Sequence, residues 1–316
     1  MKYILFTLFI AAVVFVGCKS TKEVFSKAVL VDKSELTSIS SGSAMSLLKS
    51  HFYIVGDDDP YLWKLSSSGQ VKGKWQIWDT LNIENKRIVS KLKPDFEAST
   101  FVPYKNDSLL ILLGSGSKSP NRDIIMTFHP KTFELNRFKR ERSFFYDLKN
   151  HFDLTSRELN IEALAHFRDS LYIFNRHNNT IYSITKVDFF NYKYEETTTM
   201  PFMNSKHFTL PTLDSDTARF SGANFIDGTS LLLFSATIEN TENWEKDGGI
   251  KGSFIGGIDF STNKLLFCVP VQTKEGETYI GKIEGLYGEK RDNHILVHAI
   301  TDNDDGSTLW LKIRVD

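Results

Sequence analysis

Short apolar segments recur along the sequence in one order. Each unit opens with an acidic or small residue, continues as an apolar strand, turns, and returns as a second apolar strand that ends in polar residues. The clearest copy runs from residues 160–165 through 171–174 to Asn175 and Arg176. Five such openings, roughly 54 to 65 residues apart, stand at residues 43–45, 96–98, 161–163, 221–223 and 283–285. This spacing is typical of propeller blades with long loops.

The segments between the openings indicate antiparallel strands. Turns rich in Asp, Asn, Ser and Gly separate the first two strands of four units, at residues 106–108, 168–170, 227–229 and 291–293. A third apolar strand follows in every unit, and a fourth is clearest at residues 74–78 and 264–269. A helix is expected only at residues 144–151. Repeated four-stranded antiparallel units predict an all-β protein with a single β-propeller.

The repeat count favours five blades. Six blades would result if one long interval hides a degenerate blade, and a β-sandwich is the alternative that does not explain the repeat. The last unit lacks a clear fourth strand, whereas residues 24–31 form an unassigned apolar strand near the N-terminus. We therefore expect this N-terminal strand to complete the last blade and close the ring.

The first residues resemble a bacterial lipoprotein signal. Lys2 precedes the apolar run 3–16, which is shorter than the roughly 20 residues of a membrane span. Cys18 follows Gly17 as in a lipobox, so we expect a signal peptide at 1–17, a lipidated Cys18 with a tether at 18–23, and the propeller at 24–316. The residues after Cys18 favour an outer-membrane lipoprotein of the cell envelope that faces the periplasm rather than the cell surface.

Composition narrows the choice of partners. The formal net charge is −1, which gives no indication of nucleic-acid binding. Cys268 is the only cysteine besides Cys18, and its apolar surroundings predict an inert core thiol. We expect a monomer whose partners are the membrane, through the lipid, and an unknown small molecule, glycan or envelope protein.

Polar residues at the strand ends predict a site at one mouth of the propeller channel. The first strand of a blade crosses from one face of the ring to the other, and the second strand returns. The first residues of the first strand and the last residues of the second strand therefore lie on the same face, near the channel mouth. Candidate ligand or metal residues on this rim are Asp57, Glu97, Glu162, Glu239, Glu284 and Asp302, and candidate anion-binding residues are Arg122 and Arg176. Carboxylates with interspersed arginines can hold a divalent cation such as Ca²⁺ and an anionic group. The same residues can instead cap strand ends or pair with one another.

Several of these segments resemble a known family. Residues 95–98, 113–117, 160–163 and 234–239 are similar to an uncharacterised Bacteroidota lipoprotein family of predicted β-propellers. The Glu-Ala and Glu-Gly openings are more distantly similar to those of phytase-like esterase and gluconolactonase-type propellers, and that resemblance implies a divalent metal at the channel mouth. Ser43 and Gly222 stand where the other units have glutamate.

Two classes of function remain open. The sequence has no G-x-S-x-G, H-E-x-x-H or C-x-x-C motif, and its catalytic residues are unknown. His166 and His177, near the third unit's charged residues, are the only weak candidates for a base. The favoured reading is a lipid-anchored propeller that binds an unknown ligand or partner at its channel mouth. The alternative is a divalent-metal-dependent hydrolase of a phosphoester, ester or lactone that uses the same rim.

Overall fold

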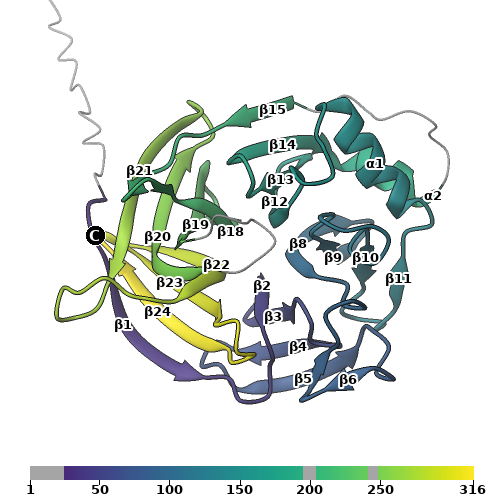
Figure 1. Cartoon of the computed structure of the whole chain (residues 1–316), viewed down its shortest axis with the longest axis horizontal. Coiled ribbons are helices and arrows are strands. Elements are labelled where there is room, and N and C mark those ends of the chain that lie inside the picture. The colour runs from purple at the N-terminus through teal and green to yellow at the C-terminus, as the bar shows by residue number, and fades with distance from the viewer. Residues whose placement is uncertain (1–24, 195–203, 241–247) are drawn as a thin grey trace, which may run out of the picture.

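The computed structural model describes residues 25–194, 204–240 and 248–316, and Cys18 lies outside these ranges. Within them the strands form five four-stranded antiparallel blades around an axis (Figure 1). From the axis outward, blade 1 consists of β2 (Gly42–Leu48), β3 (His51–Gly56), β4 (Tyr61–Ser66) and β5 (Val71–Gln76). Blade 2 consists of β8 (Phe96–Tyr104), β9 (Asp107–Gly114), β10 (Ile125–Phe128) and β11 (Leu135–Arg137). Blade 3 consists of β12 (Ile161–Phe167), β13 (Ser170–Asn175), β14 (Thr180–Thr185) and β15 (Asn204–His207).

The last two blades are joined. Blade 4 consists of β18 (Arg219–Phe225), β19 (Leu231–Asn240), β20 (Gly249–Asp259) and β21 (Lys264–Gln272). Blade 5 consists of β22 (Lys282–Arg291), β23 (His294–Asp302), β24 (Leu309–Val315) and β1 (Ala28–Glu35). Two short hairpins lie outside the blades, formed by β6 (Ile83–Glu84) with β7 (Arg87–Ile88) and by β16 (Thr212–Leu213) with β17 (Asp216–Thr217).

The N-terminal strand closes the ring, as the sequence predicts. β1 pairs antiparallel with β24 along its whole length and so becomes the outermost strand of blade 5. At Ala28 and Val29 it also pairs in parallel with Val271 and Gln272 of β21, which links blade 5 to blade 4. The innermost strands β2, β8, β12, β18 and β22 each contact the next around the axis, and β22 returns to β2. The five-bladed prediction is confirmed.

The core is divided into five clusters, one between each pair of neighbouring blades. β9 shows why the sequence produces this arrangement. Leu110 and Leu112 pack toward blade 1, whereas Leu109, Ile111 and Leu113 pack toward blade 3. Side chains alternate across a strand, so a strand buried on both faces reads as a continuous apolar run. The run at residues 109–113 therefore identifies a strand in the middle of a blade.

Two helices cover the outer edge of blades 2 and 3 (Figure 1). α1 (Glu141–His151) agrees with the expected helix at 144–151, but α2 (Lys186–Tyr194) was not predicted. Its aromatic side chains have no clear helical stripe, and they are buried because Phe189 and Tyr192 pack against Phe144 of α1. Tertiary contacts rather than local pattern thus define α2. Within the described ranges, no helix has the length and apolar character needed to cross a membrane.

The closing role of β1 predicts a specific loss of stability. Leu30 is buried in the core cluster between blades 4 and 5, whereas Lys33 of the same strand is exposed. Leu30→Ala should lower the free energy of unfolding by about 2 to 4 kcal/mol, because it removes buried apolar volume. Lys33→Ala should change it by less than about 0.5 kcal/mol. Urea unfolding of both variants tests this, and equal effects would contradict a closing role for β1.

Candidate functional site

A β-bulge near the start of each innermost strand sets one residue apart from the ladder. In β8, β12 and β22 the residues skipped by the pairing are Glu97, Glu162 and Glu284. The same skip falls at Ser43 in β2 and at Ser221 in β18. A bulge leaves the extra residue unpaired and redirects its side chain. The five blades therefore have equivalent positions beside the channel, and three of them carry glutamate.

These three glutamates, called the glutamate triad below, converge on the axis. One carboxylate oxygen from each of Glu97, Glu162 and Glu284 lies within 4.8 Å of the others. Burial and, after it, the charges of neighbouring carboxylates raise the pKa of Glu97 well above its usual range. Burial also raises the pKa of Glu284, despite the nearby Lys282. Glu284 is only 2% exposed, and its Oε2 has no hydrogen-bond partner within the described residues.

Two buried basic side chains flank the triad. Arg176 follows β13 and places Nη2 2.5 Å from Oε1 of Glu239 and Nη1 3.6 Å from Oε2 of Glu162. Lys282 places Nζ 2.9 Å from Oε1 of Glu284 and 4.0 Å from Oε1 of Glu239. Burial alone would raise the pKa of Glu239, but these two cations hold it below its usual value. Glu239 is therefore an ionised partner of Arg176 and Lys282.

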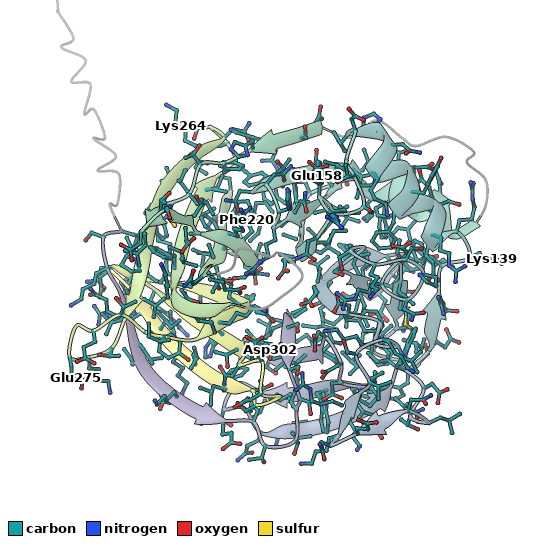
Figure 2. All side chains as sticks on the ribbon, viewed as in Figure 1. Lys139, Glu158, Phe220, Lys264, Glu275 and Asp302 are labelled. Carbon is teal, nitrogen blue, oxygen red and sulfur yellow. The ribbon has the colours of Figure 1, made fainter. Side chains whose placement is uncertain are left out.

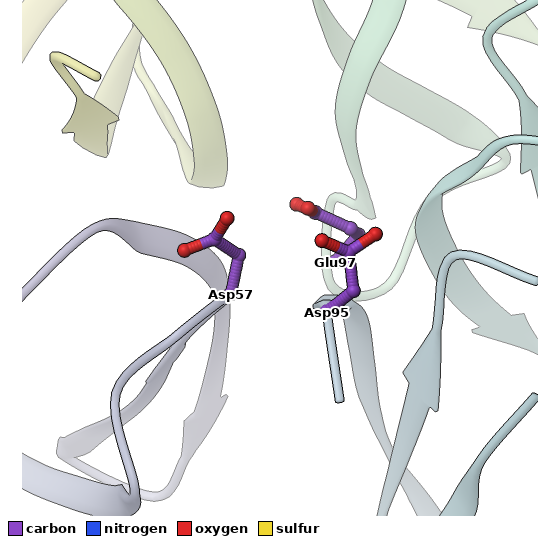
Figure 3. Close-up of side chains that lie close together, drawn as sticks. All are labelled: Asp57, Asp95 and Glu97. Carbon is purple, nitrogen blue, oxygen red and sulfur yellow. The ribbon is translucent and has the colours of Figure 1, made fainter. Parts of the chain in front are cut away.

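A second acidic group is formed by Asp57, Asp95 and Glu97 (Figure 3). Lys93 forms ion pairs with both aspartates, and its Nζ lies 2.9 Å from Oδ1 of Asp95. Nη1 of Arg122 lies 2.8 Å from Oδ2 of Asp95. Burial opposes ionisation of Asp95, yet Lys93 and Arg122 lower its pKa. Asp57 and Asp95 thus have basic partners, as do Glu162 and Glu284 of the triad, whereas no ion pair among the described residues includes Glu97.

Asp302 lies at the end of β23, close to the axis, whereas Lys139 and Lys264 lie at the outer edge of the ring (Figure 2). Burial and, after it, the charge of Asp57 raise the pKa of Asp302 to about 7. Its Oδ1 accepts a hydrogen bond of 2.9 Å from the backbone N–H of Asp304. Asp302 is thus a buried carboxyl at the mouth that can exchange a proton near neutral pH.

The three consecutive aspartates after β3 have separate roles. Asp57 points toward Asp95 and Glu97 (Figure 3), and Oδ2 of Asp58 lies 2.6 Å from Nε of Arg87 in an ion pair. Asp59 accepts hydrogen bonds from the backbone N–H groups of Ser40 and Tyr61 at 3.0 and 2.9 Å. The run therefore forms a turn with one rim residue, and its three carboxylates do not converge on one ion.

The predicted rim residues belong to one connected network. Asp57, Glu97, Glu162, Glu239, Glu284, Asp302, Arg122 and Arg176 are linked by ion pairs, close approach or mutual charge effects. Arg122 and Arg176, the predicted anion-binding residues, are both paired with carboxylates of the protein. A ligand anion would therefore have to share these guanidinium groups.

Two sequence interpretations are corrected by the structure. Ser221, not Gly222, is equivalent to the triad glutamates. Gly222 is required by close approach, because a Cβ there would lie 1.9 Å from the carbonyl oxygen of Glu284. His166 pairs with Leu171 at the far end of β12 and lines the opposite mouth of the channel, so it is not beside the carboxylates.

Sequence reasoning missed three charged residues of the site, namely Lys93, Asp95 and Lys282. Asp95 and Lys282 each stand two residues before a triad glutamate, and this repeated spacing is a signal that could have identified both. Lys93 lies in the loop before β8, where no periodicity applies.

The channel is almost closed beneath the triad. The cavity there has a volume of about 10 Å³, close to the space for one water molecule, and is lined by the triad and small residues such as Ala98, Ala163 and Gly285. Beside the mouth, a recess of about 630 Å³ is lined by Asp58 and Arg87 among others. A ligand larger than an ion therefore has room in this recess, but not within the channel.

The comparisons with known proteins give a family without an activity. Residues 38–315 match the model of a "Family of unknown function (DUF6929)". The chain belongs to DUF6929. This membership agrees with the uncharacterised family expected from the sequence, and no curated protein matches the chain.

Similar solved structures are distant from this DUF6929 chain. The glutaminyl cyclase of Myxococcus xanthus has 9% identity and a TM-score of 0.49, with 93% of this chain and 100% of that chain covered. The virginiamycin B lyase of Staphylococcus aureus has 12% identity and a TM-score of 0.39, with coverages of 90% and 99%. A DUF4221 member from Bacteroides vulgatus has 8% identity and a TM-score of 0.36, with coverages of 84% and 75%. These similarities carry no argument about function.

The raised pKa values predict that the protein without bound cations is less stable at higher pH. Glu97 and Glu284 bind protons more tightly in the folded chain than in the unfolded chain. Their contribution to the free energy of unfolding is therefore fully present below about pH 4. It is lost as the pH rises through their pKa values in the folded chain. With a chelator present, the free energy of unfolding should fall by at least about 1 kcal/mol between pH 5 and pH 8. Glu97→Gln should flatten this fall. An unfolding free energy that rises over the same range would contradict the prediction.

Proposed function

We propose that this DUF6929 protein is a ligand-binding propeller whose channel mouth holds a divalent cation and, through it, an anionic group of its ligand. The observation that carries the proposal is the glutamate triad, in which the buried Glu162 and Glu284 and the half-buried Glu97 bring carboxylate oxygens within 4.8 Å of one another, with an unpartnered Oε2 on Glu284. Buried charges need counter-charges, because removing them from water is costly. A cation at the triad supplies what the protein's own residues lack.

The charge balance of the mouth supports a cation. Seven carboxylates meet there, from Asp57, Asp95, Glu97, Glu162, Glu239, Glu284 and Asp302. Four basic side chains face them, from Lys93, Arg122, Arg176 and Lys282. The excess of negative charge is met either by protons, as the raised pKa values indicate, or by a divalent cation. An all-oxygen set of ligands suits Ca²⁺ or Mg²⁺ rather than a soft metal.

Binding without catalysis is the favoured function, because the described site offers few groups for chemistry. A metal-dependent hydrolase is the second candidate, and Asp302 is the observation in its favour. A carboxyl with a pKa of about 7 at the mouth is suited to act as a general acid or base. A bound cation would polarise the ester, phosphoester or lactone of such a substrate.

The proposed location rests on the leader sequence. A lipid on Cys18 would anchor the protein in the cell envelope, as an outer-membrane lipoprotein of a member of the Bacteroidota facing the periplasm. We expect a monomer that binds a small molecule, glycan or envelope protein, and the near-neutral charge gives no indication of nucleic-acid binding.

Calcium titration of the mature domain tests the cation site. Calcium should bind with one-to-one stoichiometry by calorimetry and raise the free energy of unfolding by about 2.7 kcal/mol at a hundredfold excess over Kd. Glu97→Gln should weaken binding at least tenfold, since it removes one charged ligand.

The control for this titration is Glu289→Gln, a change of the same kind in β22 outside the triad, which should leave the affinity unchanged. If calcium and magnesium both fail to bind the parent protein, the cation site is disproved. If they bind and a panel of esters, lactones and phosphoesters is hydrolysed, with the rate lost in Asp302→Asn, the hydrolase replaces the binding protein as the function.

The anchor is tested separately. The full-length chain expressed in a bacterial host should incorporate a labelled fatty acid and sediment with membranes, and Cys18→Ala should do neither. Cys268→Ala is the matched control, because that thiol is half-buried within β21 and burial raises its pKa to about 12. Equal labelling of the parent chain and Cys18→Ala would disprove lipidation at Cys18.

A further inference from the structure

The second acidic group at the mouth, formed by Asp57, Asp95 and Glu97, already holds a positive charge of the protein itself. One carboxylate oxygen from each of these residues lies within 4.8 Å of the others, the same limit as in the glutamate triad. Nζ of Lys93 forms ion pairs with both aspartates and lies 2.9 Å from Oδ1 of Asp95. Only 15% of the Lys93 side chain is exposed. The group thus has the oxygens of a cation site, and a lysine ammonium is seated among them.

Glu97 belongs to both acidic groups at the mouth. Asp57 points toward it from blade 1, and Asp95 stands two residues before it (Figure 3). Within the described residues Glu97 has no ion pair, whereas Asp57 and Asp95 share Lys93. A cation held by the triad would therefore be a close neighbour of the Lys93 ammonium, with Glu97 common to both positions.

An ammonium group and a calcium ion need similar sets of oxygens. Calcium binds oxygen at about 2.3 to 2.6 Å, so two ligand oxygens of one ion lie up to about 5 Å apart. A charged N–H donor approaches a carboxylate oxygen to about 2.7 to 2.9 Å. Asp57 is buried, and its Oδ1 has no hydrogen-bond partner within the described residues. Lys93 thus leaves one acceptor of the second group unused, which a divalent ion in its place could bind.

We propose that the mouth has two neighbouring cation positions that share Glu97, and that Lys93 fills one of them. This inference rests on the proposed function for the other position, the triad. Lys93 thereby limits the mouth to one metal ion, and its positive charge lowers the affinity of the triad for that ion. An anionic ligand at the mouth therefore meets one metal ion beside one ammonium group, not a pair of metal ions.

The number of calcium ions bound by a Lys93 variant tests this inference, by calorimetry and native mass spectrometry on the mature domain. Lys93→Met removes the ammonium but nearly keeps the length of the side chain. Two calcium ions should therefore bind instead of one, and the first should bind at least tenfold more tightly. Adding Asp57→Asn to Lys93→Met should return the number to one. Lys91→Met is the matched control, because it removes an exposed lysine of the same loop, and it should bind one ion with the parent affinity.

The outcomes separate this inference from the proposed function. One ion in both the parent and Lys93→Met overturns the inference and leaves the proposed function intact. No ion in the parent disproves the triad site. In that case a single ion that Lys93→Met gains, and loses again with Asp57→Asn, supports the position of Lys93, and no gain overturns it.

A second variant covers a failure to fold, because Lys93→Met leaves the buried Asp57 and Asp95 without this partner. Lys93→Gln is also neutral, but its amide can donate hydrogen bonds to carboxylates. It should bind two calcium ions as well. If Lys93→Met does not fold even with calcium, a single ion in Lys93→Gln overturns the inference.

Discussion

The convergence of five strands on one axis is the constraint on which the rest of the structure depends. Each innermost strand must approach two neighbours closely, so the residue after each bulge is small, as at Ala44, Ala98, Ala163, Gly222 and Gly285. At Gly285 a Cβ would lie 2.9 Å from that of Met45, which shows how little room the axis leaves. The side chains set apart by the bulges are therefore forced together at the mouth. The carboxylates meet because the ring closes, and β1 closes it.

Forced proximity explains the electrostatics of the mouth. Buried carboxylates repel one another strongly, and each needs either a basic partner or a proton. Asp95 and Glu239 have basic partners and a lowered pKa, whereas Glu97 and Glu284 have a raised one. Burial does not explain the contrast, because each pair consists of one buried and one half-buried acid. Asp95 pairs with two basic side chains, whereas Glu284 pairs with Lys282 alone and lies next to the other triad glutamates. The negative charge at the centre is thus only partly compensated.

The sequence predicted the parts of the molecule that repeat. Openings such as 96–98 and 161–163 indicated five blades, and the unassigned apolar strand near residue 30 indicated how the ring closes. The same repeat located the predicted rim residues, because equivalent positions of repeated units lie on the same face. Prediction from the repeat failed where one unit departs from the others. Gly222 was aligned with glutamate although the bulge places Ser221 there, and α2 depends on contacts with α1 that no local pattern records.

The closed channel gives the molecule two mouths of different chemistry. At one mouth three of the five bulge positions carry glutamate, whereas three or four residues further along the same strands the side chains are neutral, as in Thr100 and Asn224. Each innermost strand thus contributes to both mouths, but the void of about 10 Å³ between them has no room for a ligand to pass. A charge bound at the triad is also separated from the other mouth by packed backbone and small side chains. The two ends can therefore diverge in what they bind while they share one set of strands.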